Sequence, residues 1–425
     1  MFPGLRLASV LLLSLALLAS AGVIKRSTSP VTLPLTKHYN LTGASKILEL
    51  DQARAKALVE RAKSGARQSQ LAGSYNVPLV SQAVYYSTTV GIGNPPRNFS
   101  LLIDTGSSNT WVGAQLNRLF LPSLSTLLKF TGDLVYLLYG SGLFIGLEYT
   151  DTVYLNGLRI KNQGFGGALL TYGFGGTSGG PDGILGIGPV DLTCGTLFPH
   201  KSKCVPTVTD NAFKQKLIGA HEVGISFAPT TSVGDTNGEL TFGGTDLSKI
   251  NGTLTYVPIT TTSPASAYVG INQTVSYGDE VILANSAGIT DTGTTLILLA
   301  TGAFNQYQNL TGAVMDQQTG LLRVTPEQFS KLSSLFFTIG ETQFELIPNA
   351  QAWPRQLNSV IGGSSDYVYL IVGDIGPVIG GGLIGGGSIS FINGMSFLER
   401  FYHVYDAGNN LAGFAPTNYT YALIN

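Results

Sequence analysis

Charged residues are scarce in this chain. Its 24 Lys and Arg and 25 Asp and Glu together make up 12% of 425 residues, against about 25% in an average soluble protein. Hydrophobic residues make up 44%, which excludes an intrinsically disordered chain, because disorder combines low hydrophobicity with high net charge. The shortage of Glu and Lys also excludes a long coiled coil. The 54 Gly and 19 Pro indicate instead a folded protein with many turns.

Cysteine and histidine are scarce too. The two cysteines, Cys194 and Cys204, have no C-x-x-C spacing and so predict no structural zinc site. In a secreted chain an even count predicts one disulfide bond. The four histidines lack metal-ligand spacing, and the body of the chain lacks basic clusters that would bind nucleic acid. We therefore expect a monomer with no metal, no cofactor and no nucleic-acid partner.

Long apolar runs are missing except near the start of the chain. Residues 10–19 are apolar, follow Arg6 and lead into the small-x-small sequence Ala19-Ser20-Ala21. The run is shorter than the roughly 20 apolar residues of a membrane span, and it is typical of a signal peptide over 1–21. We expect a secreted, extracellular protein without a membrane anchor. Glycans are expected on some of the N-x-S/T sequons, at Asn40, Asn98, Asn251, Asn272, Asn309 and Asn418.

The net charge of −1 is a sum over two unlike parts. Residues 1–71 hold ten basic and three acidic residues, whereas 72–425 hold 14 basic and 22 acidic residues. The basic part contains a helix-like stretch over 45–63, so we interpret 22–71 as a removable pro-segment. We expect it to bind the acidic body at neutral pH through ion pairs that added salt weakens. Protonation of carboxylates should release it in acid.

The body of the chain reads as an all-β protein. Short runs rich in Val, Ile, Thr, Tyr and Phe alternate with Gly, Ser, Asn and Pro clusters, as in 83–92, 134–139 and 254–259. Helices are expected only over 209–217, 301–309 and 325–335. Because some 350 residues are too many for one β core, we expect two lobes, an N-terminal lobe over 72–255 and a C-terminal lobe over 256–425.

The body also repeats a motif. Ile103-Asp-Thr-Gly-Ser-Ser108 recurs as Thr290-Asp-Thr-Gly-Thr-Thr295, and the two aspartates lie 187 residues apart, about half of the body. Each copy follows a strand-like run and precedes a hydrophobic patch that ends in glycine. Two lobes with one origin would place Asp104 and Asp291 face to face across a pseudo-two-fold axis.

Two such turns can hydrolyse an amide. Neighbouring carboxylates cannot both ionise at low cost, so Asp104 and Asp291 would share a proton. The ionised one takes a proton from water, and the protonated one donates to the substrate carbonyl. The residues expected to support the pair are Gly106 and Gly293 through their N–H groups, Ser107 and Thr294 through their hydroxyls, and Thr105 and Thr292 by joining the two turns.

The motifs resemble those of the pepsin-like aspartic endopeptidases, and within that family the fungal polyporopepsin type. The resemblance covers the whole chain after residue 21. It rests on Leu101-Leu-Ile-Asp-Thr-Gly-Ser-Ser-Asn-Thr-Trp-Val112, on Tyr139-Gly-Ser-Gly142 and on Phe397-Leu-Glu-Arg-Phe-Tyr-His-Val-Tyr-Asp406. It implies a bilobal all-β acid-protease fold of two homologous β-barrel-like lobes with the cleft between them. It also implies a secreted zymogen that cleaves peptide bonds beside bulky apolar side chains at acidic pH.

The resemblance also implies roles for individual residues. Asp104 and Asp291 would be the catalytic pair, and a hairpin would cover the substrate, with Tyr139 at its tip hydrogen-bonded to Trp111. The other implied substrate-binding residues are Gly140, Ser141, Leu102, Phe144, Ile184, Gly106, Gly293, Thr294 and Thr295. Its own pro-segment would be an intramolecular inhibitor, and Lys37 and Lys63 are candidates for the base that pairs with the dyad.

The sequence departs from the family pattern in four places. Met395 stands where the family has an aspartate that adjusts the dyad, and Asn393 stands where an apolar residue is usual. Leu143 replaces a hydroxyl residue of the covering hairpin, and the usual disulfide of the second lobe is absent. These departures bear on the expected pH optimum and leave the expected chemistry unchanged.

Two alternatives have less support. The sequence Gly176-Thr-Ser-Gly-Gly-Pro181 resembles a serine-nucleophile segment, but no histidine precedes it outside the pro-segment. We interpret it as a glycine-rich loop. A pepsin-like protein without activity, which only binds ligands or proteins, would be expected to lack part of the Asp pair or the hairpin tyrosine, and both are present.

Overall fold

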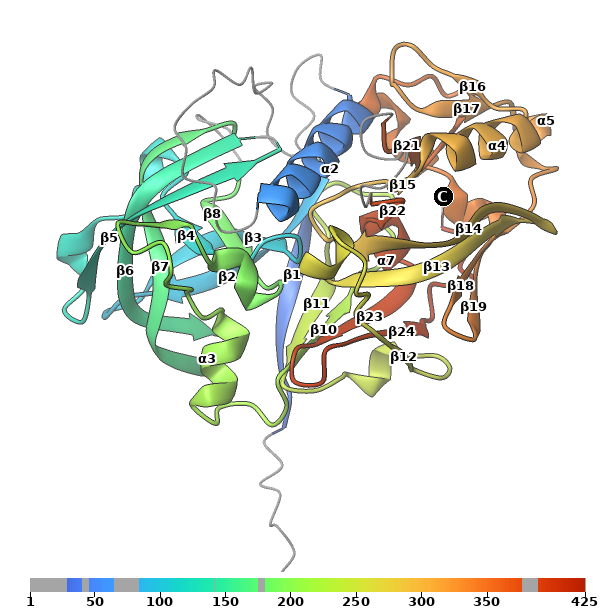
Figure 1. Cartoon of the computed structure of the whole chain (residues 1–425). Helices are drawn as coiled ribbons and strands as arrows, with labels where there is room; N and C mark the ends of the chain where they lie inside the picture. The colour runs from blue at the N-terminus through green and yellow to red at the C-terminus, as the bar shows by residue number, and fades with distance from the viewer. Residues whose placement is uncertain are drawn as a thin grey trace, which may run out of the picture.

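The computed structural model describes residues 29–39, 46–64, 84–140, 142–174, 180–376 and 389–424. Two lobes lie on either side of a long helix, α2 (Ile47–Ser64), which crosses between them (Figure 1). The predicted signal peptide, the predicted junction near residue 72 and the glycine-rich run 380–388 lie outside the described residues.

The larger sheet has fourteen strands and runs from the N-terminal lobe to the strands between the lobes (Figure 1). Apolar side chains alternate along its long strands and face a buried core. In spatial order the strands are β12 (Thr255–Pro258), β24 (Leu411–Pro416), β23 (Phe401–Asp406), β10 (Glu222–Ser226), β11 (Thr236–Phe242), β1 (Val31–Tyr39), β2 (Val84–Ile92), β3 (Arg97–Asp104), β8 (Gly183–Gly186), β4 (Thr110–Val112), β7 (Leu158–Tyr172), β6 (Gly142–Leu155), β5 (Lys129–Tyr139) and β9 (Leu197–Phe198).

The C-terminal lobe has a seven-stranded and a three-stranded sheet. The strands of the first are β19 (Thr342–Leu346), β18 (Leu335–Ile339), β13 (Gly270–Tyr277), β14 (Glu280–Thr290), β22 (Phe391–Asn393), β15 (Ile297–Leu299) and β21 (Val372–Asp374). Those of the second are β16 (Val314–Met315), β17 (Leu322–Val324) and β20 (Val368–Leu370). The prediction of two β lobes is confirmed.

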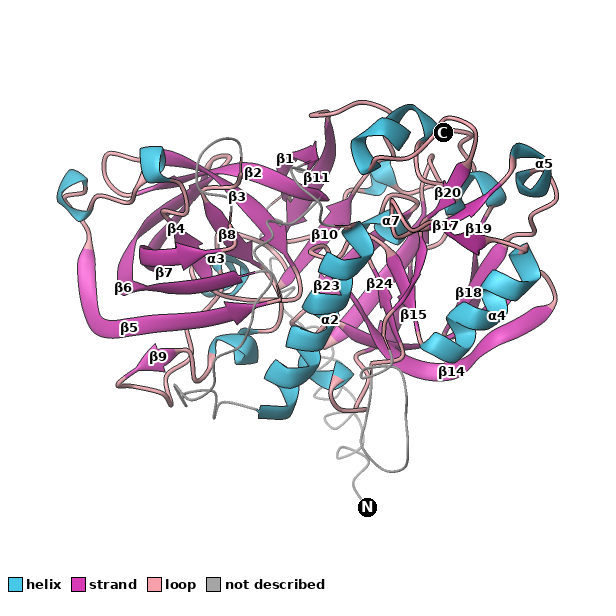
Figure 2. Ribbon diagram, turned by 90° about the horizontal axis from the view of Figure 1, so that it is seen from above, coloured by secondary structure: helices cyan, strands magenta, loops and turns pink. Residues whose placement is uncertain are grey.

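Apart from α2 the helices are short, and they lie outside the sheets (Figure 2). The α-helices besides α2 are α3 (Val208–Lys214), α4 (Thr301–Thr311), α5 (Pro326–Phe329) and α7 (Met395–Leu398). The 3-10 helices are η2 (Leu116–Arg118), η3 (Pro122–Leu124), η4 (Val190–Thr193), η5 (Leu247–Lys249), η6 (Ala265–Ala267), η7 (Pro348–Gln351) and η8 (Arg355–Ile361). Within the described ranges no helix is long and apolar enough to cross a membrane. The disulfide between Cys194 and Cys204 is present, as predicted.

The two lobes repeat one arrangement of three strands. In the N-terminal lobe β3 pairs in parallel with β8, and β8 pairs antiparallel with β4. In the C-terminal lobe β14 pairs in parallel with β22, and β22 pairs antiparallel with β15. The internal repeat therefore corresponds to a structural repeat, and each Asp-Thr-Gly turn follows the first strand of its triplet.

The pro-segment contributes a strand that the sequence analysis did not predict. β1 lies between β11 and β2 and pairs antiparallel with both, so the strand is part of the large sheet. Leu33 and Leu35 on this strand are buried in the main core. The predicted pro-segment thus contacts the rest of the protein in two places, through β1 in the sheet and through α2 between the lobes.

Candidate active site

The two Asp-Thr-Gly turns meet at the centre of the molecule. Thr105 N donates to Thr292 Oγ1 and Thr292 N donates to Thr105 Oγ1, both at 3.0 Å. These reciprocal bonds join the ends of β3 and β14 across the lobes. Asp104 and Asp291 follow those strands and are fully buried. The structure therefore brings together the two carboxylates that the repeat predicted to face each other.

Each carboxylate is held by its own turn. Gly106 N donates to Asp104 Oδ1 at 2.9 Å, and Ser107 Oγ donates to Asp104 Oδ2 at 2.5 Å. The second lobe repeats this, because Gly293 N and Thr294 Oγ1 donate to Asp291 at 3.1 and 2.6 Å. Donors of this kind favour the ionised form of a carboxylate. They also fix both groups in orientation before any substrate binds.

A guanidinium group lies between the two carboxylates. Arg54, on α2, donates from Nη2 to Asp104 Oδ1 at 2.5 Å and to Asp291 Oδ1 at 2.8 Å, and from Nε to Asp291 Oδ2 at 2.6 Å. Its side chain is 7% exposed. A planar guanidinium suits such forked recognition of carboxylates. While Arg54 is in place, it occupies the position where a water would have to be held by both aspartates.

The charge of Arg54 changes the titration of Asp291. Burial raises the pKa of Asp291, but the charge and hydrogen bonds of Arg54 and the bonds from Thr294 and Gly293 outweigh it, so the pKa lies below its ordinary value. Burial lowers the pKa of Arg54, but the charges of the two aspartates raise it further. Arg54 therefore keeps its positive charge and Asp291 its negative charge in the buried site.

Further contacts hold α2 along the cleft. Asp51, one turn before Arg54, accepts hydrogen bonds from Thr295 N at 3.1 Å and Leu296 N at 2.8 Å. Gln52 donates to the carbonyl of Asp374 at 2.8 Å.

The part of α2 beyond Arg54 is also held. Tyr268 Oη donates to the carbonyl of Leu58 at 2.7 Å, and Arg61 donates to the carbonyl of Leu192. The helix thus contacts both lobes along its length.

Sequence analysis missed Arg54 and Asp51. Of the two bases it named for the dyad, Lys37 is buried beside Glu399, Tyr39 and Tyr86 instead, and the side chain of Lys63 lies outside the described residues. Ten basic residues precede residue 72, and no pattern among them selects one. The spacing of Asp51 and Arg54 puts both on one face of a helix, but it does not indicate that this face lies against the two aspartates.

The covering hairpin is formed by β5 and β6. Trp111 Nε1 donates to Tyr139 Oη at 2.9 Å, and burial raises the pKa of the Tyr139 hydroxyl. A Cβ atom on Gly140 would lie 2.2 Å from the Cα of Arg54, so only glycine allows this approach of hairpin and helix. Ser141 lies outside the described residues.

The apolar residues predicted for the primary pocket belong to one buried cluster. Leu102, Tyr139, Phe144 and Ile184 are its members, together with Trp111. The rings of Trp111 and Phe144 have centroids 4.5 Å apart. The cluster lies under the hairpin, next to Asp104 on β3. Leu102 and Phe144 are too deeply buried to be open to solvent while the pro-segment is bound.

These groups are suited to hydrolysis by an activated water. Two buried carboxylates with matching donors can share one proton, so that one takes a proton from water as the other donates to a carbonyl oxygen. The water oxygen attacks the carbonyl carbon, and no covalent intermediate with the protein forms. The hairpin can exclude bulk water from the site.

Comparisons with known proteins agree with this geometry. The family model described as "Eukaryotic aspartyl protease" matches residues 85–417. The chain belongs to the eukaryotic aspartyl proteases. Polyporopepsin of Irpex lacteus is 55% identical over 351 residues, covering 82% of this chain and 99% of the relative. Cathepsin E of Cavia porcellus is 31% identical over 356 residues, covering 81% and 84%.

A solved structure has the same fold. The crystal structure of the aspartic proteinase from Irpex lacteus superposes with a TM-score of 0.76 and 47% identity, covering 93% of this chain and all of that one. The expected pepsin-like fold is therefore confirmed. This aspartyl protease is an aspartic-type endopeptidase, and its substrates are polypeptides.

The bond between Trp111 and Tyr139 gives a first test of the aspartyl protease's hairpin. We expect Tyr139→Phe to lower kcat/KM about 3- to 10-fold, since one buried hydrogen bond contributes about 0.5–1.5 kcal/mol. Steady-state kinetics with a peptide substrate measure this. Tyr136→Phe, on the same strand but half-buried, is the matched control. Equal kinetics for both variants would mean that the bond has no part in the reaction.

Proposed function

We propose that the protein is a secreted endopeptidase that is made as an inactive zymogen, works at acidic pH and prefers bulky apolar side chains around the scissile bond. Asp104 and Asp291 activate the water, Tyr139 closes over the substrate, and residues 22–71 are the inhibitor. The observation that carries this proposal is the position of Arg54 between the two carboxylates. The apolar preference rests on the buried cluster under the hairpin.

Acid should weaken the contact of Arg54. Because the pKa of Asp291 is depressed in the docked state, its contribution to docking is present at neutral pH and is lost as pH falls through the depressed value. Asp51 acts the other way, since burial raises its pKa to about 7. Its protonation favours docking as pH falls from about 7 toward 3.8. We therefore assign acid release to the dyad rather than to Asp51.

Salt should matter less than acid. The ion pairs of Arg54 with the dyad and of Lys37 with Glu399 join the predicted pro-segment to the body, and these pairs are buried. Buried pairs are screened less than exposed ones.

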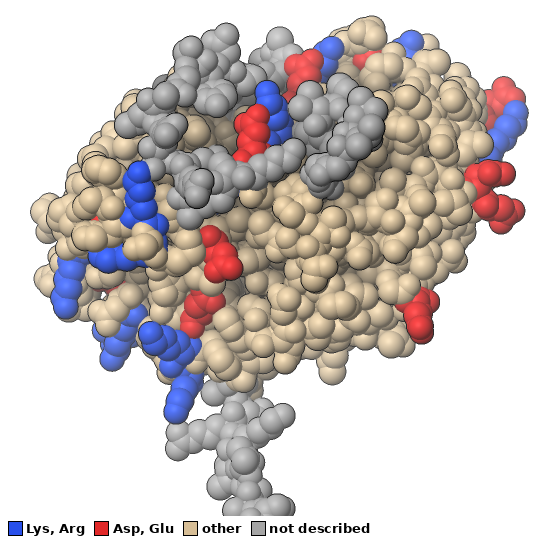
Figure 3. Space-filling model, in the orientation of Figure 1, with Lys and Arg blue, Asp and Glu red and all other residues tan. Residues whose placement is uncertain are grey.

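The sparse charge of the body also suits an acid enzyme. Figure 3 shows that most of one face carries no charged side chain, with Lys and Arg gathered toward the N-terminal lobe. The body has 14 basic residues in 72–425, so few positive charges repel one another after the carboxylates protonate.

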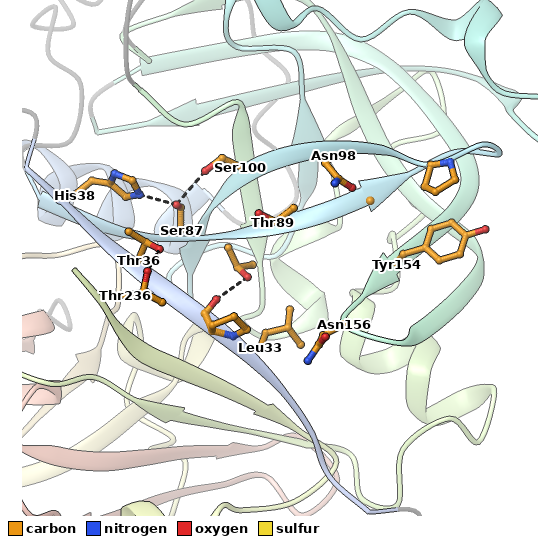
Figure 4. A pocket seen from close by; sticks show the side chains of 14 residues that line it. Leu33, Thr36, His38, Ser87, Thr89, Asn98, Ser100, Tyr154, Asn156 and Thr236 are labelled. Carbon is orange, nitrogen blue, oxygen red and sulfur yellow. Dashed lines mark hydrogen bonds between the residues drawn. The ribbon is translucent and has the colours of Figure 1, made fainter. Parts of the chain in front are cut away.

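Strand β1 contains a second acid-sensitive group. His38 Nε2 is 2.9 Å from Ser87 Oγ, which accepts from Ser100 Oγ at 3.0 Å. Its ring stacks on Tyr85 at 4.8 Å. Figure 4 shows His38, Ser87 and Ser100 at the wall of a cavity of about 590 Å³ along the strand. The outer side of β1 is therefore incompletely packed.

His38 should help to release β1 in acid. Burial lowers its pKa from 6.5, so the neutral imidazole favours docking, and this contribution is lost as pH falls from 6.5 through the lowered value. We expect His38→Gln, which keeps a donor and an acceptor, to slow pro-segment release below pH 6.5 by on the order of 2- to 5-fold. The rate is measured from samples of the acidified zymogen that are taken at successive times and separated on a denaturing gel. His200→Gln should leave it unchanged, and equal slowing in both variants would remove His38 from this role.

The proposed function is tested by acidifying the purified precursor. We expect the chain to shorten near residue 72 and then to cleave a denatured protein beside bulky apolar side chains. The precursor should be inactive at neutral pH. No cleavage anywhere between pH 2 and 6, with or without the pro-segment, would exclude an acid endopeptidase.

A further inference from the structure

The two catalytic aspartates have different surroundings behind them. In the parallel pairing of β3 with β8, the residue before Asp104 is Ile103, opposite Leu185. In the equivalent pairing of β14 with β22, the residue before Asp291 is Thr290, opposite Asn393. All four side chains are at most 1% exposed. The lobe repeat thus places two polar side chains where its counterpart has two apolar ones.

Thr290 is connected to a buried histidine. Its Oγ1 lies 3.0 Å from His403 Nε2 and 3.3 Å from the carbonyl of Val269. On the other side of the ring, His403 Nδ1 lies 3.1 Å from the carbonyl of Gly413. His403 is fully buried and stacks on Phe414 at 4.9 Å.

This arrangement satisfies both protonation states of the ring. When His403 is neutral, Nδ1–H donates to Gly413 and the Thr290 hydroxyl donates to Nε2. When His403 is protonated, Nε2–H donates to Thr290 Oγ1, and the hydroxyl turns to donate to Val269. A buried group that loses no hydrogen bond on gaining a proton can titrate without rearrangement of the fold.

Asn393 is held by a second polar side chain. Gln273 Nε2 donates to Asn393 Oδ1 at 3.1 Å, and Asn393 Nδ2 donates to Gln273 Oε1 at 2.8 Å. Asp291 N donates to the carbonyl of Asn393 at 3.2 Å. The amide pair therefore fixes the strand that holds the backbone of Asp291.

The stability of the fold does not by itself explain the buried polar side chains behind Asp291. The first lobe builds the same strand triplet with Ile103 and Leu185, and burying polar groups costs free energy unless every partner is present. In the second lobe every partner is present: Thr290 directly precedes Asp291 and contacts His403, and the carbonyl of Asn393 accepts from Asp291 N. The polar groups thus act at the catalytic loop rather than in the general core.

We propose that His403 is a positioning residue for the reaction. Acting through Thr290, it holds the loop of Asp291 and, when protonated, places a positive charge behind this aspartate that keeps the dyad ionised in acid. The proposal rests on the acid activity proposed above. It gives the second lobe an electrostatic role that the first lobe lacks.

The titration of His403 falls in the range that this role requires. Burial lowers its pKa to about 4, although the bond to Gly413 acts in the opposite direction. The ionisable groups on the neighbouring elements are engaged elsewhere or remote in register. Glu222 lies three residues along β10 from Ile225, the register partner of His403, Glu399 pairs with Lys37, and β24 has no ionisable residue. Arg400 donates to carbonyls of the C-terminal residues.

The test is the pH dependence of kcat/KM for the activated enzyme. His403→Phe keeps the ring and its stacking but cannot be charged. We expect its acid limb to move up by about half a pH unit or more, because the variant lacks the positive charge beside Thr290. Its neutral limb should stay in place, because His403 is uncharged there. His221→Phe, which removes a histidine stacked on Phe213, should leave both limbs unchanged.

Thr290→Val removes the hydroxyl and should move the acid limb in the same direction. Combined with His403→Phe it should add little, since the two residues act as one unit. An acid limb identical to that of the native enzyme in both variants would overturn the proposal, even if thermal stability fell. Loss of activity at every acidic pH in the native enzyme would instead contradict the proposed function.

A measurement on the native protein covers the case in which His403→Phe does not fold. Histidine NMR between pH 2 and 6 should show His403 titrating near pH 4 while the fold persists. Asp291→Asn should lower this midpoint, because linkage between the two charges is reciprocal. A ring that stays neutral down to pH 2 in the folded protein, or a midpoint that Asp291→Asn leaves unchanged, would overturn the proposal.

Discussion

Asp291→Asn should reduce kcat of the activated enzyme by at least about 10⁴-fold, and Asp104→Asn should do the same. An amide in place of either carboxylate removes one partner of the shared proton, so the pair can no longer take a proton from water while donating one to the carbonyl. The hydrogen bonds from Gly293 and Thr294 point at the carboxylate oxygens. In the Asn variant the side-chain NH2 group would replace one carboxylate oxygen, and this donor would face the N–H or O–H donor that bonds to that oxygen.

This result is measured with a fluorogenic peptide after the pro-segment has been removed by a trace of native enzyme, because the variant cannot process itself. Asp133→Asn is the matched control, since Asp133 is as deeply buried and pairs with His200 outside the cleft. It should keep near-native kcat. Comparable activity in Asp291→Asn and Asp133→Asn would remove the dyad from the mechanism.

The sequence predicted the dyad because its evidence is local and repeated. Each Asp-Thr-Gly turn carries its own donors, and the spacing of the two copies is that of two lobes. The reciprocal bonds of Thr105 and Thr292 follow from that symmetry. The position of Arg54 depends on where a whole helix sits between lobes, and no repeat or spacing in the sequence encodes such a docking. Hence the dyad was predictable and its partner was not.

The secondary-structure predictions were likewise correct where the signal is local and failed where an element depends on partners far along the chain. The pro-segment helix was expected over 45–63 and is α2 at Ile47–Ser64. The helix expected over 325–335 is only α5, Pro326–Phe329, because Leu335 begins β18, which pairs with β13 and β19. Strand β1 was not predicted. Its apolar residues gain their partners from β2 and β11, at least 45 residues away along the chain.

We expect Arg54→Gln to open the active site of the proposed zymogen at a higher pH. Removing one member of a buried ion pair costs about 3–5 kcal/mol, which weakens docking of α2 by roughly 10²- to 10³-fold. The loss also removes the main cause of the low pKa of Asp291. The pair of aspartates then shares a proton at a higher pH, and the pro-segment should be released at a pH at least one unit higher than in the native zymogen.

The unprocessed variant should therefore cleave peptides near pH 6, where we expect the unprocessed native chain to be inactive, and active-site titration measures the open fraction. Lys56→Gln on the same helix is the control, since Lys56 is exposed and, in the part of the chain that the structure describes, pairs with Glu60 one turn away, a contact worth under about 0.5 kcal/mol. If both zymogens open at the same pH as the native one, β1 and the apolar face of α2 hold the pro-segment. The guanidinium would then block the dyad without contributing to docking, and acid release would have to begin at His38 in the sheet.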